Sequence, residues 1–379
     1  TALSCSSAAS GVYKSQSEHW APTPAKHGIF VPLAEAIRRQ VNIPVFAVGR
    51  VTDPFHAEKI IADKQADMVG MTRANICDPE LVAKIKRNDI KQIRPCVGAN
   101  ACIANRYVGK PINCMHNTMV SKPGVKLQSA TQPKSIVVIG GGPAGLEVAR
   151  IAAERGHSVE VFEKNKRVGG QLALWAAAPS MGELGNIIRW RISELDRLGV
   201  KIHLNQAIEK ADLDSLNADE IVIATGSNDF NQLVLGEHTI QTVTPHDLLR
   251  GGVVQANKAL VINEGRGQAG LAAAELLLSK GIDVEIISSD IAVGADIDSP
   301  NRTAWLMRLG AKGCHFRATQ IFFSTQVNQV ACRYFYHERV NSGGGIYFTF
   351  TVNVCRDNTR FTTLHRCLSD TIAYTSSCF

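Results

Sequence analysis

Residues 136–164 constrain the fold more than any other stretch of this sequence. Residues 136–139 form a short run of β-branched apolar side chains, which predicts a buried parallel strand. Glycines then follow in the spacing G-x-G-x-x-G, and a helical apolar stripe runs from there to Gly156. Residues 158–162 predict a second strand that ends at Glu163. This order predicts a strand–helix–strand unit within a parallel sheet.

The three glycines each meet a different physical need of a phosphate-binding turn. Gly140 permits the tight turn, Gly142 lets a pyrophosphate approach the backbone, and Gly145 lets the helix pack close to the strand. The helix N-terminus offers free N–H groups to the phosphates, and a carboxylate about twenty residues on accepts from ribose hydroxyls. A glycine turn without a ligand is the structural alternative. The predicted adenosine site comprises Gly140, Gly142, Pro143, Ala144, Gly145 and Glu163.

Length and charge set the broad class. A chain of 379 residues is expected to form two or three domains, and 45% hydrophobic with 20% charged residues is typical of a soluble globular protein. The net charge of +7 is spread without a block of like charges, so we expect no nucleic-acid partner. We see no membrane span and no signal peptide, and we expect a cytoplasmic protein. The missing initiator Met indicates processing or a fragment.

Residues 1–94 read as alternating strands and helices, the rhythm of a parallel barrel or open sheet. Two of the predicted strands, at residues 43–48 and 66–70, are followed by Gly49-Arg50 and by Met71-Thr72-Arg73. Loops at the C-terminal face of a (β/α)8 barrel commonly hold a phosphate, and a guanidinium is a good partner for one. Each Arg has an alternative role as a solvated loop residue.

Three cysteines, Cys96, Cys102 and Cys114, lie within residues 95–117, a loop-like stretch. Thiolates at such short spacing suit an iron–sulfur cluster or zinc in a reducing compartment. Three buried thiols without a metal are the alternative.

A second glycine turn follows further along the chain. Residues 259–263 predict a buried strand, residues 271–280 a helix, and residues 284–287 the next strand. Ser288 stands where Glu163 stands in the first unit, so no acid faces a ribose; this is compatible with NADP(H) or with no nucleotide. The glycines of this turn are Gly265, Gly267 and Gly270.

The order IPVFAVGRVTDP, ADMVGMTRANICDPEL, RPCVGANACI and VVIGGGPAGLEVAR resembles the trimethylamine dehydrogenase and 2,4-dienoyl-CoA reductase family over residues 1 to about 312. The resemblance implies an old-yellow-enzyme-like FMN barrel, a [4Fe-4S] segment and a dinucleotide-binding region for FAD or ADP. It implies that the FMN phosphate is held by Gly49, Arg50, Thr72 and Arg73, and the cluster by Cys96, Cys102 and Cys114. It also places Gly170 and Gln171 near the pyrophosphate and Thr225 and Gly226 at the crossing between domains, where flavoproteins with two dinucleotide folds carry Ala-Thr-Gly.

The sequence departs from the family pattern at two places. Ala99 stands at the second position of the family's cysteine motif, so one cluster ligand is missing. Only the last two or three of eight barrel strands fit before Cys96, so the strands that carry the catalytic acid/base residues are absent and the catalytic residues stay unknown. From about residue 313 the helical stripe is lost and Cys, Phe, Tyr and Thr crowd together, which favours truncation or a shifted reading frame after Leu309-Gly310.

The predicted fold class is α/β. The expected domains are the C-terminal part of a (β/α)8 barrel (1–94), a Cys-cluster linker (95–131), an FAD/ADP-binding Rossmann-like domain (132–250), an NAD(P)-binding-like half (251–312) and an atypical tail (313–379). The predicted function is an oxidoreductase that passes hydride or electrons between an amine or enone and the second nucleotide region. The expected cofactors are FMN, FAD or ADP, a [4Fe-4S] or [3Fe-4S] cluster and NAD(P)H; the expected partners are a small-molecule substrate, an electron-transfer protein and further copies of the chain. The alternatives are an FAD-only NAD(P)H:acceptor reductase and a non-catalytic dinucleotide-binding remnant.

Overall fold

The computed structural model describes residues 20–122, 125–227, 242–264, 267–326, 329–334, 337–338, 347–348, 352–356 and 360–364. The chain divides into two compact units, one of residues 1–228 with 298–304 and one of residues 229–297 with 305–379. The expectations for residues 1–19, for Gly265 and for much of the tail fall outside the described residues. No helix in the described part of the chain is both long and apolar enough to span a membrane.

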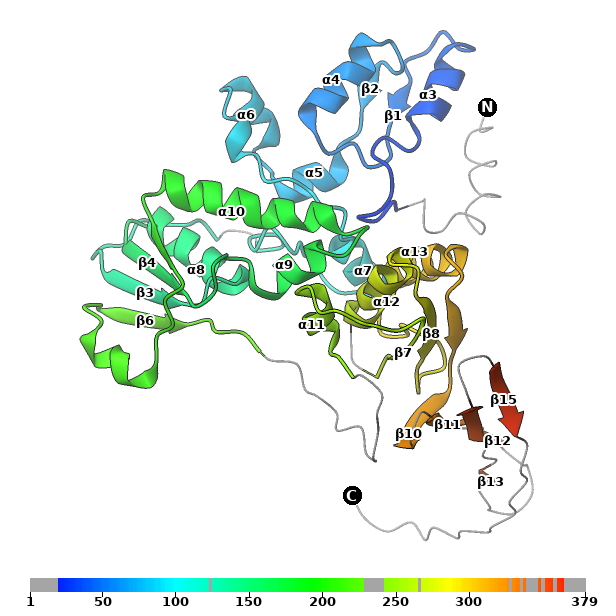
Figure 1. The fold of residues 1–379 in the computed structure, drawn as a ribbon. Coiled ribbons are helices and arrows are strands. Elements are labelled where there is room, and N and C mark those ends of the chain that lie inside the picture. The colour runs from blue at the N-terminus through cyan, green and yellow to red at the C-terminus, as the bar shows by residue number, and fades with distance from the viewer. Residues whose placement is uncertain are drawn as a thin grey trace. The chain divides into compact units, whose positions relative to one another are not determined.

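The first unit begins with the predicted alternation of helices and strands (Figure 1). Asp53 caps a helix as expected, because its Oδ1 accepts from the Phe55 N–H at 3.1 Å and Pro54 occupies the first helical position. The elements are α3 (Val31–Arg38), β1 (Phe46–Ala47), α4 (Pro54–Ala62), β2 (Met68–Val69), α5 (Thr72–Cys77), α6 (Leu81–Lys86) and the 3-10 helix η1 (Ile90–Gln92).

The strands of this part are shorter and more exposed than the sequence suggests. β1 pairs in parallel with β2, and the two form a two-stranded sheet in the described part of the chain. Ile43 and Phe46 are 69% and 59% exposed, so the prediction of a buried strand over residues 43–48 is wrong. A run of apolar residues indicates a strand, but burial requires elements on both of its faces. The core that does form contains Val31, Ala34, Ala47, Val51, Ile60 and Ala66.

The cysteine segment is partly helical. α7 (Ala101–Tyr107) carries Cys102, although residues 95–117 read as a loop. Asn100 precedes the helix in the left-handed region with φ +59°, and Gly109 follows it at φ +68°. The side chain of Asn100 is buried and its Nδ2 donates to the Trp20 carbonyl at 2.6 Å, which stabilises this otherwise unfavourable backbone conformation.

The predicted strand–helix–strand unit lies in a four-stranded parallel sheet with strand order β5-β4-β3-β6. Ile139, the last residue of β3, pairs with Phe162 on one side and with Ile223 on the other. The strands therefore end together at one edge, where the loops that follow them meet (Figure 1). The elements are β3 (Ser135–Ile139), α8 (Pro143–Glu154), β4 (Ser158–Glu163), α9 (Gly170–Ala176), η2 (Gly182–Leu184), α10 (Gly185–Arg197), β5 (Lys201–Leu204), η3 (Lys210–Ser215) and β6 (Glu220–Ile223).

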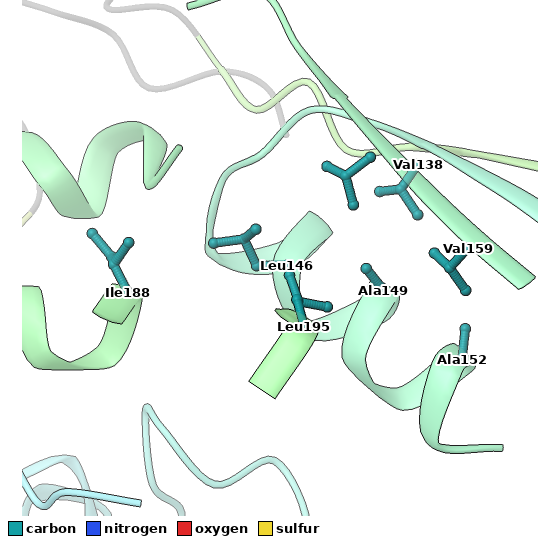
Figure 2. Close-up of a cluster of buried hydrophobic side chains, with 8 residues drawn as sticks. Val138, Leu146, Ala149, Ala152, Val159, Ile188 and Leu195 are labelled. Atoms are coloured by element: carbon teal, nitrogen blue, oxygen red, sulfur yellow. The ribbon is translucent and has the colours of Figure 1, made fainter. Parts of the chain in front are cut away.

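Figure 2 shows the core between this sheet and its helices. Val138, Leu146 and Leu195 are fully buried, and they come from β3, α8 and α10 respectively. Burying one such aliphatic side chain contributes roughly 1.5–3 kcal/mol, so this core fixes the start of α8 against the strand ends. The remaining members are Ala149, Ala152, Val159, Val161 and Ile188.

The second unit contains a parallel sheet of strand order β7-β8-β9. Its third strand comes from residues 315–317, beyond the boundary at 312 that the sequence suggested. The elements are α11 (Pro245–Leu249), β7 (Lys258–Ile262), α12 (Ala269–Ser279), β8 (Asp283–Ile287), α13 (Ser299–Ala311), of which residues 299–304 belong to the first unit, and β9 (His315–Arg317). Antiparallel pairs follow, formed by β10 (Gln320–Gln326), β11 (Gln329–Tyr334), β12 (His337–Glu338), β13 (Tyr347–Phe348), β14 (Val352–Arg356) and β15 (Arg360–Leu364).

Candidate cofactor-binding site

The glycine turn between β3 and α8 contains two glycines that the fold itself needs and one that faces open space. A Cβ added at Gly140 would lie 2.3 Å from the Ala224 carbonyl oxygen, and Gly140 has φ +111°. A Cβ added at Gly145 would lie 1.9 Å from the Gly140 oxygen. At Gly142, by contrast, no described atom lies within 4 Å of the added Cβ. Gly142 is therefore not required by the packing of the protein itself, as expected of the residue that a pyrophosphate approaches.

Glu163 lies at the end of β4 with its carboxylate directed at this turn. Its side chain is buried, and Oε2 accepts from the Gly141 N–H at 2.8 Å. Oε1 accepts from the backbone N–H of Asn165 at 2.8 Å and from its Nδ2 at 2.6 Å. A carboxylate offers about four lone-pair sites, so about one remains for a ribose hydroxyl while these three bonds persist.

The other predicted contacts of the dinucleotide gather around the same turn. The N–H of Gly169 donates to the Gly141 oxygen at 2.7 Å, and a Cβ added at Gly170 would lie 3.1 Å from the Gly142 Cα. Gln171 Nε2 donates to the Ser227 oxygen at 2.8 Å. Thr225 and Gly226 follow β6, which pairs with β3 beside the turn. The structure thus brings together every residue of the first predicted dinucleotide site.

The three predicted cluster cysteines also lie near one another, since each of Cys96, Cys102 and Cys114 interacts electrostatically with the other two. The Cys114 sulfur accepts the His116 backbone N–H. Burial raises the pKa of the Cys96 and Cys102 thiols, and the backbone N–H groups of Gly98 and Ile103 act in the opposite direction. The His116 bond measures 3.4 Å. Hydrogen bonds to the sulfurs are one of the features that tune an iron–sulfur cluster, so this donor set fits one.

Sequence reasoning missed a fourth cysteine at this place, Cys77. It lies eight residues beyond β2 at the end of α5, and its Sγ lies 3.4 Å from the Pro95 carbonyl oxygen and 3.8 Å from His116 Nδ1. The neighbouring Cys114 and burial raise the pKa of Cys77, while Cys77 lowers the pKa of Cys114 to about 6 against the effect of burial. No short cysteine spacing in the sequence signals it, because α5 meets this segment only in the folded chain.

No three His, Cys, Asp or Glu side chains of the described residues gather closely enough to bind one metal ion. Thiolates of one tetrahedral zinc ion lie about 3.8 Å apart, given Zn–S bonds of about 2.3 Å. The cysteines of this segment do not have that arrangement. A cluster of several irons takes its thiolates at different irons and therefore spaces them more widely, so the zinc alternative fits this segment less well.

The two arginines predicted at the FMN phosphate have side chains that are bonded within the protein. Arg50 is 1% exposed at its side chain and pairs with Glu183, and its guanidinium also reaches the Val97 oxygen at 3.5 Å. Burial and the charge of Arg73 lower the pKa of Arg50 to about 10. Arg73 donates to the Ala21 oxygen at 2.8 Å and to Asn100 at 2.5 Å. Sequence reasoning also missed Glu183, whose other oxygen lies 2.5 Å from His27 Nε2.

The glycine turn of the second unit has a different construction. Residues 263–268 connect β7 to α12, whereas only residues 140–142 connect β3 to α8. A Cβ added at Gly270 would lie 2.6 Å from Asn263 Oδ1, so Gly270 allows close packing as Gly145 does. Ser288 is buried and its Oγ donates to the Asn263 oxygen at 3.1 Å, so its hydroxyl is engaged within the fold. Gly267 is described, with φ +97°.

A parallel sheet with a glycine turn at a helix N-terminus and an acid after the next strand is typical of a dinucleotide-binding fold. Comparison with family models identifies the family: residues 109–212 and 134–330 match the pyridine nucleotide-disulphide oxidoreductases, and residues 12–92 match the NADH:flavin oxidoreductase / NADH oxidase family. The chain belongs to the flavin-dependent oxidoreductases that join these two parts, which confirms the resemblance to the trimethylamine dehydrogenase and 2,4-dienoyl-CoA reductase family.

The chain is similar to curated relatives over part of their length. It is 37% identical over 279 residues to N,N-dimethylglycine/sarcosine dehydrogenase of Chromohalobacter salexigens, covering 71% of this chain and 40% of the relative. It is 40% identical over 200 residues to the multifunctional alkene reductase/demethylase OYE of Caballeronia cordobensis, covering 52% and 29%. The structure of histamine dehydrogenase from Rhizobium sp. 4-9 shares the fold with a TM-score of 0.75 at 23% identity, covering 83% of this chain and 48% of that one.

Proposed function

We propose that this chain is part of a flavin- and iron–sulfur-dependent oxidoreductase that passes hydride or electrons between an organic substrate and its nucleotide-binding region. The observation that carries the proposal is the glycine turn at Gly142, which is open to a pyrophosphate and faces the buried carboxylate of Glu163. FMN and FAD supply the redox chemistry when bound, and the protein positions them. The catalytic residues are not assigned, because this chain spans less than half of the first relative's length.

An amine is the proposed substrate class, with an enone as the second candidate. The relative at 37% identity is by name a dehydrogenase of N-methylated amino acids, which supports oxidation of an N-methylated amine. The relative at 40% identity is by name both an alkene reductase and a demethylase, which supports either substrate. The substrates are small molecules in both cases.

Residues 20–92 supply two strand–helix units that suit the end of an FMN barrel, with Gly49, Arg50, Thr72 and Arg73 at the strand ends. Because both guanidiniums are bonded within the protein, we expect Arg50 and Arg73 to brace the loops that hold a phosphate. Gly49 and Arg50 have φ +108° and +60°, an unusual backbone conformation that this bracing maintains.

Cys96, Cys102 and Cys114 are the proposed cluster ligands, since their thiols lie near one another and the Cys114 sulfur accepts the His116 backbone N–H. His116 Nδ1 lies 3.0 Å from the Pro95 carbonyl oxygen, which only accepts, so Nδ1 carries the proton and Nε2 keeps the lone pair of the ring. Among the described residues Nε2 is buried without a hydrogen-bond partner, so it is the atom through which His116 would replace the ligand that Ala99 lacks. Three thiolates suffice for a [3Fe-4S] cluster, or for three irons of a cubane with a fourth ligand of another kind.

An FAD-only NAD(P)H:acceptor reductase is the second candidate function. The observation that favours it is the internal bonding of Arg50 and Arg73, which leaves the FMN phosphate to be held mainly by the backbone. A non-catalytic remnant is the third candidate function, and it would bind a dinucleotide at the same first glycine turn.

The absorbance spectrum of the anaerobically purified chain, with its extracted flavins identified by chromatography, tests the proposal. FMN and FAD together with broad iron–sulfur absorbance are expected. A single flavin without iron would replace the proposal by the FAD-only reductase. A colourless protein that takes up neither flavin on reconstitution would leave the non-catalytic dinucleotide-binding remnant as the remaining candidate function.

A further inference from the structure

The second glycine turn carries a carboxylate that the sequence pattern did not single out, that of Glu264. The turn follows β7, whose last residue Ile262 pairs with Ile287 at the end of β8. The Ser289 backbone N–H donates to Glu264 Oε1 at 3.1 Å, and the Ser289 hydroxyl donates to Glu264 Oε2. The Glu264 side chain therefore bridges the turn and the end of the next strand, which is where the adenosine ribose of a dinucleotide lies in this kind of fold.

The first unit has the same bridge, built in the opposite direction. Glu163 ends β4 and accepts from the Gly141 N–H in the turn, whereas Glu264 lies in the turn and accepts from a residue that follows β8. The register is the same in both units, because Gly140 and Asn263 each donate an N–H across to the neighbouring strand, at 2.7 Å and 2.8 Å respectively. A carboxylate thus lies between the two strand ends in both units, although residue 288 of the second unit is not an acid.

The charge at this place decides which dinucleotide fits. A carboxylate accepts from the 2′-hydroxyl of the NAD(H) ribose, and about two of its lone-pair sites remain beside the bonds from Ser289. The 2′-phosphate of NADP(H) lacks that hydroxyl and brings about two negative charges towards the carboxylate, which repels them. Residues 288–290 include no Lys or Arg, and the guanidinium of Arg317 on β9 pairs with Glu285. The place therefore favours a ribose hydroxyl over a phosphate.

We propose that the second unit takes NAD(H) in preference to NADP(H), and that Glu264 is the residue that sets this specificity. The proposal rests on the proposed function, because it presupposes a nucleotide at the second glycine turn. It differs from the expectation drawn from Ser288, which was compatible with NADP(H). The difference arises because the carboxylate comes from the turn and not from the end of the strand that follows it.

A second carboxylate at this turn acts on both dinucleotides alike. Asp296 Oδ2 accepts from the Gly267 N–H at 2.5 Å. A pyrophosphate at the start of α12 needs such N–H groups, so either dinucleotide displaces the Asp296 carboxylate when it binds. Because the pyrophosphate is common to NAD(H) and NADP(H), Asp296 lowers both affinities and leaves their ratio to Glu264.

The test is calorimetry with NAD⁺ and NADP⁺ on the chain saturated with FAD, which fills the first glycine turn. In their oxidised form neither dinucleotide passes a hydride to FAD. NAD⁺ should bind about tenfold more tightly than NADP⁺. Glu264→Gln keeps an acceptor for Ser289 but removes the charge, and it should reduce this preference to about twofold by tightening NADP⁺. The titrations are repeated without FAD in Gly142→Val, which closes the first turn.

The matched control is Asp283→Asn, which removes an exposed carboxylate at the opposite end of β8 and should leave the ratio of the two affinities unchanged. Asp296→Asn should tighten both dinucleotides by a similar factor. Equal affinities of the native chain for NAD⁺ and NADP⁺, or a folded Glu264→Gln variant with the native preference, would overturn the proposal while the flavin part of the proposed function stands. A native chain that binds FAD but neither dinucleotide also overturns it and leaves the first dinucleotide site intact.

Discussion

Replacing Gly142 by Val should weaken adenine-dinucleotide binding about a hundredfold without unfolding the protein. Gly142 precedes α8 with φ −74° and ψ 177°, an extended conformation that a β-branched residue adopts readily. Apart from its chain neighbours, no described atom lies within 4 Å of an added Cβ, so the Cβ of the new side chain has room. The free energy of unfolding should change by no more than about 1 kcal/mol, the scale of the preference for Gly over an aliphatic residue before a helix.

The binding loss follows from what occupies that open space in the complex. A pyrophosphate at the N-terminus of α8 accepts N–H bonds as an anion, and each such bond contributes about 1.5–3 kcal/mol. A valine in the same space displaces the phosphate and removes one or two of these bonds. A loss of about 3 kcal/mol of binding free energy raises the dissociation constant roughly a hundredfold. Calorimetry with ADP measures this, and thermal unfolding followed by circular dichroism establishes that the variant is folded.

Valine substitutions at two further glycines serve as controls for Gly142→Val. Gly182→Val places the same side chain at an exposed site where the added Cβ meets only the Ala176 oxygen, at 3.9 Å, and should leave ADP affinity unchanged. Gly145→Val forces a Cβ to 1.9 Å from the Gly140 oxygen and should destabilise the fold by about 3 kcal/mol or more. A folded Gly142→Val variant that binds ADP with native affinity would refute the assignment of the site.

Three other perturbations test the first unit. Glu147→Gln should cost about 3–5 kcal/mol of stability, because it leaves the buried guanidiniums of Arg150 and Arg191 without their shared carboxylate, and urea unfolding measures it. Burial opposes ionisation of Glu147, but the two arginines outweigh burial and lower the pKa of Glu147 from its ordinary value of 4.5. The stability that the ionised carboxylate provides is therefore present above pH 4.5 and declines as the pH falls below that. Unfolding curves of Glu147→Gln should lack this part of the acid destabilisation, and pH profiles identical to those of the native chain would contradict the assignment. Asp53→Ala should cost about 1 kcal/mol through loss of the α4 cap, and an unchanged denaturation midpoint would show that the cap is dispensable. Ala99→Cys should raise the iron retained per chain in air after reconstitution, and equal retention in both chains would mean that the native site already has a fourth ligand.

The local pattern of the sequence was enough to predict the first dinucleotide-binding unit. The apolar run, the glycine spacing and Glu163 are all contained within thirty residues, and the structure forms β3, α8 and β4 almost at the predicted bounds. The same holds for α4, whose beginning is marked by Asp53 and Pro54. Neighbours in sequence decide these features, because turns, caps and strand–helix units are formed by short-range bonds.

Local patterns did not predict which side chains would be buried or what the arginines would bind. The residues 43–48 look like a core strand, yet Phe46 is exposed because burial depends on elements distant in the sequence. That Arg50 helps hold a phosphate stays a prediction, but its pairing with Glu183, which lies 133 positions away, could not be read from the local sequence.

The cysteine segment divides in the same way between sequence and structure. Its short spacing indicated that Cys96, Cys102 and Cys114 would lie together, and they do. Only the folded chain brings the Cys77 sulfur to 3.8 Å from His116 Nδ1, because α5 packs on a segment nearly forty residues further along. The sequence therefore determined which groups can serve as ligands, whereas the tertiary structure decided which donors surround them, since hydrogen-bond geometry depends on contacts that a one-dimensional pattern does not contain.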